Sequence, residues 1–251
     1  MRIRDLSHVR IEPVDFSSAG GTVRGLLYHA GVEATCVVLC HGYSSSKHNV
    51  DPLAFGLAAD GFAALAFDFQ GHKLGASSLP LHSAYDLRNN ALDAVAHART
   101  FPFVERVLLA GHSMGAAAAI GAAVENPEVA GVIAMCTALG RNRSLQAGGM
   151  LGGLQNRASY VDGPSPAEMT RAMDGFTQRI GEIAPRPLLV IAASKDALVA
   201  PSAVRELFDA AGEPKEFVTV EATHTDCAER SKFVIVRWLR ERGFSAPQSN
   251  G

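Results

Sequence analysis

The chain has 251 residues, with 23 Lys and Arg against 25 Asp and Glu, a formal net charge of −2. The balanced charge and the lack of a basic block give no indication of nucleic-acid binding. The length is enough to bury a large core without disulfides or metal ions. The N-terminal residues lack the apolar core of a signal peptide, and no segment is long enough to span a bilayer, so we expect a cytoplasmic protein.

Apolar runs alternate with helical patterns along most of the chain. Residues 8–17 and 22–29 are typical of two strands joined by a tight turn. Further strands are predicted at residues 35–40, 62–67, 103–110, 129–136, 187–193 and 216–221, and helices at residues 51–60, 83–100, 113–125, 201–211 and 225–240. This alternation predicts a doubly wound α/β fold over residues 1–251, with a mostly parallel sheet covered by helices on both faces.

Residues 140–183 interrupt the alternation. They show no strand pattern and contain glycines at positions 148, 149, 152 and 153, followed by a helix start at Ser165-Pro166-Ala167-Glu168. So long a loop is unusual inside a compact domain, so we expect a short cap insertion over the active edge; a surface excursion without a role is the alternative. Met169, Met173 and Phe176 follow at helical spacing and suit either a pocket wall or ordinary core.

A strand-to-helix junction carries the clearest catalytic signal. An apolar run of strand length ends in Gly111-His112-Ser113-Met114-Gly115, and an alanine-rich run of helix length follows at once. Gly-x-Ser-x-Gly between a strand and a helix is typical of a nucleophile elbow, with the serine at a strained apex and Gly111 and Gly115 where strand and helix approach closely. A serine that only caps the helix is the alternative.

A serine nucleophile requires a base and a carboxylate from the same edge of the sheet. Asp196 follows one later strand and His224 the next, which gives the chain order Ser, Asp, His of the hydrolase fold. Glu221 belongs to a strand and Asp226 is too near His224 in sequence, so Asp196 is the best candidate for the acid. Asp68 and His72 end an earlier strand, and we expect them to fix a loop by hydrogen bonds.

The tetrahedral intermediate also requires donors for its oxyanion. The backbone N–H of Met114, at the predicted helix start, is one candidate. The backbone N–H of Tyr43, in the turn after His41-Gly42, is the second, with an ordinary glycine turn as the alternative.

The cysteines give no sign of a metal or a disulfide. Cys36 and Cys40 would lie on one face of a strand about 13 Å apart, too far for a bridge, and Cys136 and Cys227 lack ligand-like spacing. We therefore expect four buried thiols, no metal and no cofactor.

From about residue 35 onward the sequence resembles the α/β-hydrolase superfamily. The motifs that carry the resemblance stand in family order: His41-Gly42-Tyr43, Asp68-Phe69-Gln70-Gly71-His72, Gly111-His112-Ser113-Met114-Gly115, Asp196 and His224. Residues 41–77 look most like small bacterial carboxylesterases, cinnamoyl-type esterases and serine-aminopeptidase-like hydrolases. One departure is Lys73-Leu74-Gly75, where such sequences commonly have Gly-x-Ser straight after Gly-His.

Together these features predict a serine hydrolase that cleaves small carboxylic esters of short to medium acyl length through an acyl-enzyme. The predicted catalytic residues are Ser113, Asp196 and His224. An amidase or peptidase, a thioesterase or acyltransferase with the same residues, and a non-catalytic ligand-binding member of the fold are the alternatives.

Overall fold

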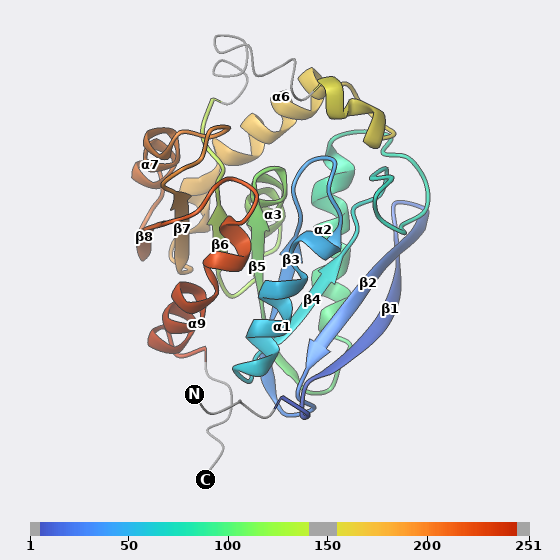
Figure 1. Cartoon of the computed structure of the whole chain (residues 1–251), viewed down its shortest axis with the longest axis vertical. Helices are drawn as coiled ribbons and strands as arrows, with labels where there is room; N and C mark the ends of the chain where they lie inside the picture. The colour runs from blue at the N-terminus through green and yellow to red at the C-terminus, as the bar shows by residue number, and fades with distance from the viewer. Residues whose placement is uncertain (1–5, 141–154, 245–251) are drawn as a thin grey trace.

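The computed structural model, which describes residues 6–140 and 155–244, contains an eight-stranded sheet in the order β1-β2-β4-β3-β5-β6-β7-β8 (Figure 1). β1 and β2 pair antiparallel, as do β2 and β4, and the later neighbours pair in parallel. The strands are β1 (Arg10–Ser18), β2 (Gly21–His29), β3 (Ala34–Cys40), β4 (Ala63–Phe67), β5 (Val104–His112), β6 (Val132–Met135), β7 (Leu188–Ala193) and β8 (Lys215–Val220).

Helices cover both faces of this sheet (Figure 1). One face packs against α2 (Tyr85–Ala98), α3 (Met114–Glu125), α6 (Pro166–Thr177) and α7 (Pro201–Asp209). The other face packs against α1 (Asp51–Ala59), α8 (Cys227–Arg230) and α9 (Lys232–Glu241). Three short 3₁₀ turns are also present among the described residues: η1 (Lys47–Asn49), η2 (Ala158–Tyr160) and η3 (Ile180–Ile183). The predicted doubly wound α/β fold is therefore confirmed.

The central strands are buried on both faces because each presents apolar side chains to two helical layers. In β3, Cys36, Val38 and Cys40 join the layer of α2 and α3, whereas Val37 and Leu39 join that of α1 and α9. This alternation is the two-residue period of a strand. It explains why the sequence shows an unbroken apolar run here. The predicted burial of all four thiols, Cys36, Cys40, Cys136 and Cys227, is also confirmed.

The predicted insertion is described only in part, because residues 141–154 lie outside the described residues. Ser165 caps α6 through a capping box with Glu168, as the sequence predicts. Met169, Met173 and Phe176 are buried in the same layer as α3, and a Cβ placed on Gly121 of α3 would lie 2.8 Å from the Phe176 ring. This part of the insertion therefore belongs to the core.

Two details of the predicted elements are corrected. The helix expected over residues 225–240 is divided into α8 and α9 at Ser231, whose hydroxyl donates to the carbonyl of Cys227 at 2.6 Å. The strand expected over residues 129–136 is shorter, since β6 covers only Val132–Met135.

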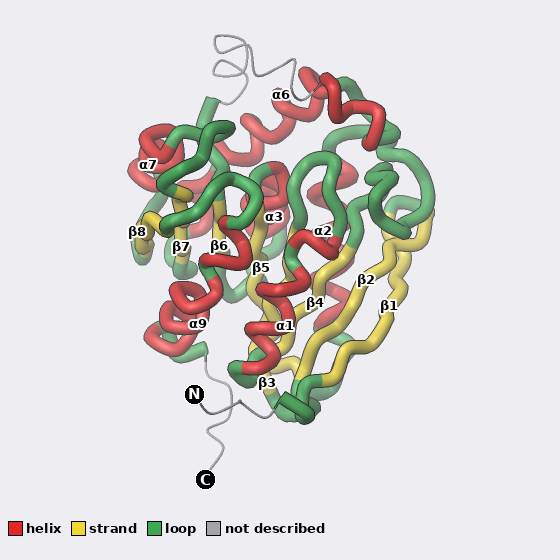
Figure 2. The backbone as a smooth tube through the Cα atoms, viewed as in Figure 1, coloured by secondary structure: helices red, strands yellow, loops and turns green. Residues whose placement is uncertain are grey.

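Figure 2 shows that the loops after the parallel strands gather on one edge of the sheet, the edge beside α6. This edge carries the candidate site. Within the part of the chain that the structure describes, no helix has the length and apolar character needed to cross a membrane.

Candidate active site

Ser113 lies at a sharp bend between β5 and α3. Its backbone has φ +56° and ψ −115°, a conformation that a residue with a side chain rarely adopts. A simple helix cap, the alternative, would require a hydrogen bond between the serine side chain and the first turn of α3. Ser113 makes no such capping bond. The strained backbone and the strand–turn–helix setting are those of a nucleophile elbow.

The two glycines of the elbow are required by close packing of the backbone. A Cβ on Gly111 would lie 2.2 Å from the carbonyl oxygen of Gly115. A Cβ on Gly115 would lie 2.2 Å from the carbonyl oxygen of Cys40 and 2.4 Å from that of His41. Because these contacts are with backbone atoms, a side chain at either position could be accommodated only by moving α3 away from the sheet.

The turn after β3 lies directly beside Ser113. A Cβ on Gly42 would lie 3.6 Å from the Cβ of Ser113 and 3.2 Å from Nδ1 of His112. Tyr43, whose amide is a predicted oxyanion donor, follows in this turn, and Met114, the other predicted donor, begins α3. Met114 is therefore the chain neighbour of Ser113, and Tyr43 follows the glycine that lies beside it.

His41 ties this turn to the end of β4. The N–H of Phe69 donates to Nε2 of His41 at 3.0 Å, so Nδ1 carries the proton and donates to the carbonyl of Gly42 at 2.8 Å. Burial, with the nearby His72 as a second contribution, lowers the pKa of His41 to about 3. The ring is therefore neutral at neutral pH. It holds the turn by hydrogen bonds, a role that the sequence motif alone did not reveal.

Asp196 and His224 form a hydrogen-bonded pair at the ends of β7 and β8. Nδ1 of His224 donates to Oδ2 of Asp196 at 2.7 Å, and the N–H groups of Leu198 and Val199 donate to Oδ1, each at 2.8 Å. Burial alone would raise the pKa of Asp196, but these hydrogen bonds outweigh it and hold the pKa below its usual value. Asp196 is therefore an ionised carboxylate that orients the imidazole.

The two rival carboxylates interact elsewhere. Glu221 accepts a hydrogen bond from the ammonium of Lys195 at 2.8 Å on the surface. Asp226 accepts hydrogen bonds from the N–H and the hydroxyl of Thr223, both at 2.6 Å. Of the carboxylates weighed from the sequence, Asp196 is the one that contacts His224.

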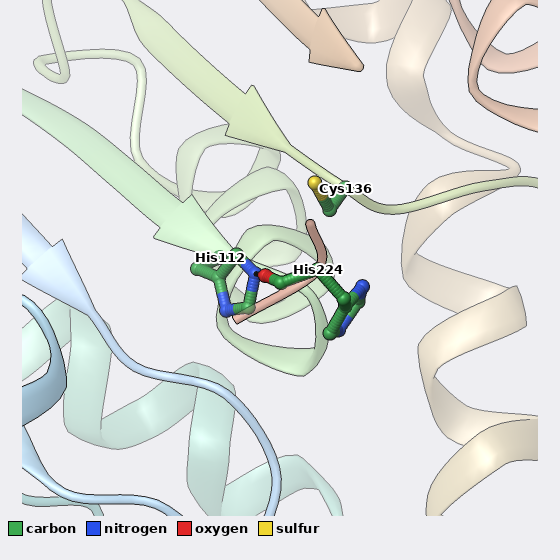
Figure 3. A group of neighbouring side chains, drawn as sticks. All are labelled: His112, Cys136 and His224. Carbon is green, nitrogen blue, oxygen red and sulfur yellow. Dashed lines mark hydrogen bonds between the residues drawn. The ribbon is translucent and has the colours of Figure 1, made fainter. Parts of the chain in front are cut away.

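Two further side chains, which the sequence analysis left out of the site, lie against His224 (Figure 3). One nitrogen or sulfur atom from each of His112, Cys136 and His224 lies within 4.8 Å of the others. Hydrogen bonding to Cys227, together with burial, raises the pKa of the Cys136 thiol above its usual value, and the thiol also interacts with Asp196. The spacing of these residues in the sequence gave no signal for this group, which forms only through the fold.

A buried ion pair fixes the loop that follows β4. The Asp68 carboxylate accepts hydrogen bonds from the ammonium of Lys47 at 2.6 Å, from the N–H of Lys47 at 2.7 Å and from that of Ala76 at 2.8 Å. Burial alone would raise the pKa of Asp68, but these bonds hold it below its usual value. His72 donates through Nδ1 to the carbonyl of Gln70 at 3.1 Å. The predicted loop-fixing roles of Asp68 and His72 are confirmed.

The insertion contacts both loops that border the site. Arg157 donates through Nε to the hydroxyl of Ser44 at 2.6 Å, one residue beyond Tyr43. The N–H of Lys73 donates to the carbonyl of Tyr160 at 2.9 Å, so the unusual Lys73-Leu74-Gly75 segment lies where the insertion docks. The insertion therefore helps to shape the turn after β3 and the loop after β4.

Comparison with known proteins places the chain in a family. The family model for serine aminopeptidase, S33, matches residues 32–160, about half of the chain. The chain therefore belongs to this family and is an α/β hydrolase, as its resemblance to the superfamily predicts.

The individual proteins that the chain resembles share 18 to 34% of their aligned residues with it. The chain is 34% identical over 136 residues to Thiohydrolase apmlB of Arthrinium phaeospermum, an alignment that spans 51% of this chain and 43% of that protein. The esterase Pf2001 of Pyrococcus furiosus superposes with a TM-score of 0.72 at 21% identity, covering 94% of each chain. Est1E of Butyrivibrio proteoclasticus, solved with ferulic acid bound, has a TM-score of 0.72 at 18% identity, covering 93% of this chain and 98% of its own. At these identities the structural likenesses show a shared fold.

The Asp68–Lys47 pair leads to a prediction about stability. Lys47→Met should lower the free energy of unfolding at pH 7 by about 3 to 5 kcal/mol, because it leaves a buried carboxylate without its counter-ion. The lowered pKa of Asp68 means that the pair stabilises the fold above the ordinary carboxyl pKa of about 4, and that this contribution is lost as the pH falls further. Urea unfolding at pH 7 and at pH 3 to 4 measures both effects.

Lys73→Met, at an exposed lysine of the adjoining loop, is the matched control and should change stability by less than about 0.5 kcal/mol. Adding Asp68→Asn to Lys47→Met should recover part of the loss, since no ionised carboxylate is then buried. A Lys47→Met variant as stable as the control would contradict the prediction.

Proposed function

We propose that this chain is a serine hydrolase that cleaves carboxylic esters of small molecules through an acyl-enzyme. Ser113 is the nucleophile, His224 the general base and Asp196 the carboxylate that orients His224. The observation that carries the proposal is that the Asp196–His224 pair, from the ends of β7 and β8, lies against His112, the residue before the strained Ser113 at the end of β5. A serine hydroxyl reacts at neutral pH only when such a base accepts its proton.

The proposed reaction has two halves. Ser113 attacks the ester carbonyl while His224 accepts the hydroxyl proton, which it then gives to the departing alcohol. Water then attacks the acyl carbonyl while His224 accepts its proton. The bond between the acyl carbon and Oγ of Ser113 breaks, His224 returns the proton to that oxygen, and the acyl group leaves as a carboxylic acid. Asp196 stays ionised throughout and stabilises the imidazolium, consistent with its lowered pKa. These steps require no cofactor.

We assign the oxyanion donors to the backbone N–H groups of Tyr43 and Met114. The position of Gly42 supports this assignment: a Cβ built there would lie 3.6 Å from the Cβ of Ser113, so the turn that carries Tyr43 lies beside the serine that Met114 follows. Main-chain donors held in this way need no reorganisation as charge develops on the oxygen, an effect worth several kcal/mol in related sites. His41, which is neutral and hydrogen-bonded to both neighbouring loops, keeps the turn in place.

Thioester hydrolysis is the second candidate. The likeness to Thiohydrolase apmlB favours it, and the same serine chemistry serves both bonds. The two candidates differ only in the leaving group, so substrates with a common acyl group separate them.

The nucleophile assignment predicts that Ser113→Ala lowers kcat for p-nitrophenyl butyrate by at least about a thousandfold, because no hydroxyl remains to form the acyl-enzyme. The thermal unfolding midpoint of the variant should stay close to that of the parent. Ser202→Ala, on the exposed side of α7, is the matched control and should keep full activity. Normal turnover by Ser113→Ala would sink the proposal; labelling of Ser113 by a fluorophosphonate without any ester turnover would favour a ligand-binding role instead.

The base assignment predicts a pH profile. The value of kcat/KM should fall as the pH drops below about 6 to 7, where an imidazole base ordinarily gains a proton. Because the pKa of Asp196 is held low, that carboxylate stays ionised through this range, and the acid limb should follow a single protonation. Initial rates from pH 5 to pH 9 measure the profile. A rate that stays flat through the window would argue against His224.

The leaving-group preference is measured with phenyl butyrate, S-phenyl thiobutyrate and butyranilide, which share one acyl group and one phenyl group. We expect the ester to be cleaved with the highest kcat/KM and the anilide at least about a hundredfold more slowly, because this reaction class needs strong protonation of an amine leaving group. A thioester rate more than tenfold above the ester rate would replace the ester proposal with the second candidate.

A further inference from the structure

His112 links the candidate nucleophile to the candidate base. Its Nε2 lies 2.6 Å from the carbonyl oxygen of His224, and the two residues are 112 positions apart in the chain. The two imidazole rings also lie against each other, with centroids 4.7 Å apart and planes inclined by 56° (Figure 3). His112 is itself the last residue of β5 and the covalent neighbour of Ser113.

The partner of Nε2 determines where the proton of His112 lies. A carbonyl oxygen only accepts hydrogen bonds, so Nε2 must carry the proton and donate it. His112 is 4% exposed, and a Cβ built on Gly42 would lie 3.2 Å from its Nδ1, so the turn after β3 lies against that side of the ring. The imidazole of His112 is therefore confined between the turn after β3 and the loop that carries His224.

Two different contacts hold the two ends of His224. Asp196 binds the imidazole at Nδ1, and His112 binds the main-chain carbonyl. The first contact sets the rotation of the ring, whereas the second sets the position of the backbone from which the ring projects. His112 ends β5, the strand that leads into the elbow. The second contact therefore links the main chain of His224 to the strand that carries Ser113.

We propose that His112 is a positioning residue, which holds the main chain of His224 at a fixed place relative to Ser113 by donating the Nε2 hydrogen bond. The inference rests on the proposed function, in which His224 acts as the base for Ser113. A shift of the base of about 1 Å can cost up to a hundredfold in rate, so a single hydrogen bond at this place has a large effect on catalysis.

A metal ion on His112, Cys136 and His224 is the competing interpretation of this group. Two of the four ring nitrogens already donate hydrogen bonds, one to the carbonyl of His224 and one to Asp196. The raised pKa of the Cys136 thiol keeps that group protonated, whereas a metal ligand is a thiolate. The hydrogen bonds favour a positioning role over metal ligation.

The test compares variants that keep or remove the donor. In His112→Gln the amide nitrogen can reach the place of Nε2 and keep the bond, whereas His112→Phe keeps an aromatic ring but no donor. His112→Asn is a shorter amide that does not reach the carbonyl. We expect kcat/KM for p-nitrophenyl butyrate to fall about tenfold to a hundredfold in the Phe and Asn variants, and to stay within about threefold of the parent in the Gln variant.

A second measurement follows His224 without turnover. In the Ser113→Ala background, NMR of labelled histidine reports the pH at which His224 protonates. Loss of the donor loosens the pairing with Asp196, so this pH should fall in His112→Phe and stay unchanged in His112→Gln. The other titratable groups that lie against His224 are the same in every variant: Asp196 after β7 and Cys136 after β6, the latter hydrogen-bonded to Cys227 of α8.

The outcomes separate this inference from the proposed function. If His112→Phe keeps the parent rate and the parent titration of His224, or if the Gln variant loses as much activity as the Phe variant, the positioning role is wrong. Should His112→Phe fail to fold, the comparison of Gln with Asn decides in the same way. Turnover that survives Ser113→Ala would instead overturn the proposed function, whatever the His112 variants do.

Discussion

The close contact between α3 and the carboxyl end of β3 is the constraint on which the rest of the site depends. The backbone at Gly115 packs directly against the carbonyl groups of Cys40 and His41, which leaves no space for a side chain. This contact brings the start of α3 beside the turn at Gly42 and forces the backbone of Ser113 into its left-handed conformation. The strain at one residue is sustained because a sheet and a helix are packed on both sides of it.

Most of the fold could be predicted because parallel strands that are covered on both faces have a simple sequence pattern. Unbroken apolar runs such as residues 35–40 are typical of strands buried on both faces, and polar residues mark where each run ends. The division between α8 and α9 could not be seen this way. Ser231 is compatible with a continuous helix, and its identity does not show that α8 ends at Arg230 and α9 begins at Lys232.

The site could be predicted as far as strand order determines it. Strand ends on one edge bring Ser113, Asp196 and His224 to the same region, and the pairing of Asp196 with His224 followed from their order. The contacts of His112, Cys136 and Arg157 were missed, because each depends on where a side chain points after the loops have packed. No periodicity in the sequence encodes a contact between residues 112 and 224.

The edge of the sheet holds two buried carboxylates of closely similar design, and the difference between them indicates which one suits catalysis. Asp68 and Asp196 both have fully buried side chains, both accept two main-chain N–H groups and both pair with one side-chain donor. An ammonium ordinarily keeps its protons across neutral pH, so Lys47 makes the first pair a permanent link between two loops. An imidazole can gain and lose a proton at its other nitrogen while the bond to the carboxylate stays in place. Only the second pair therefore combines a fixed position with a movable proton, and it is the pair that lies against the elbow.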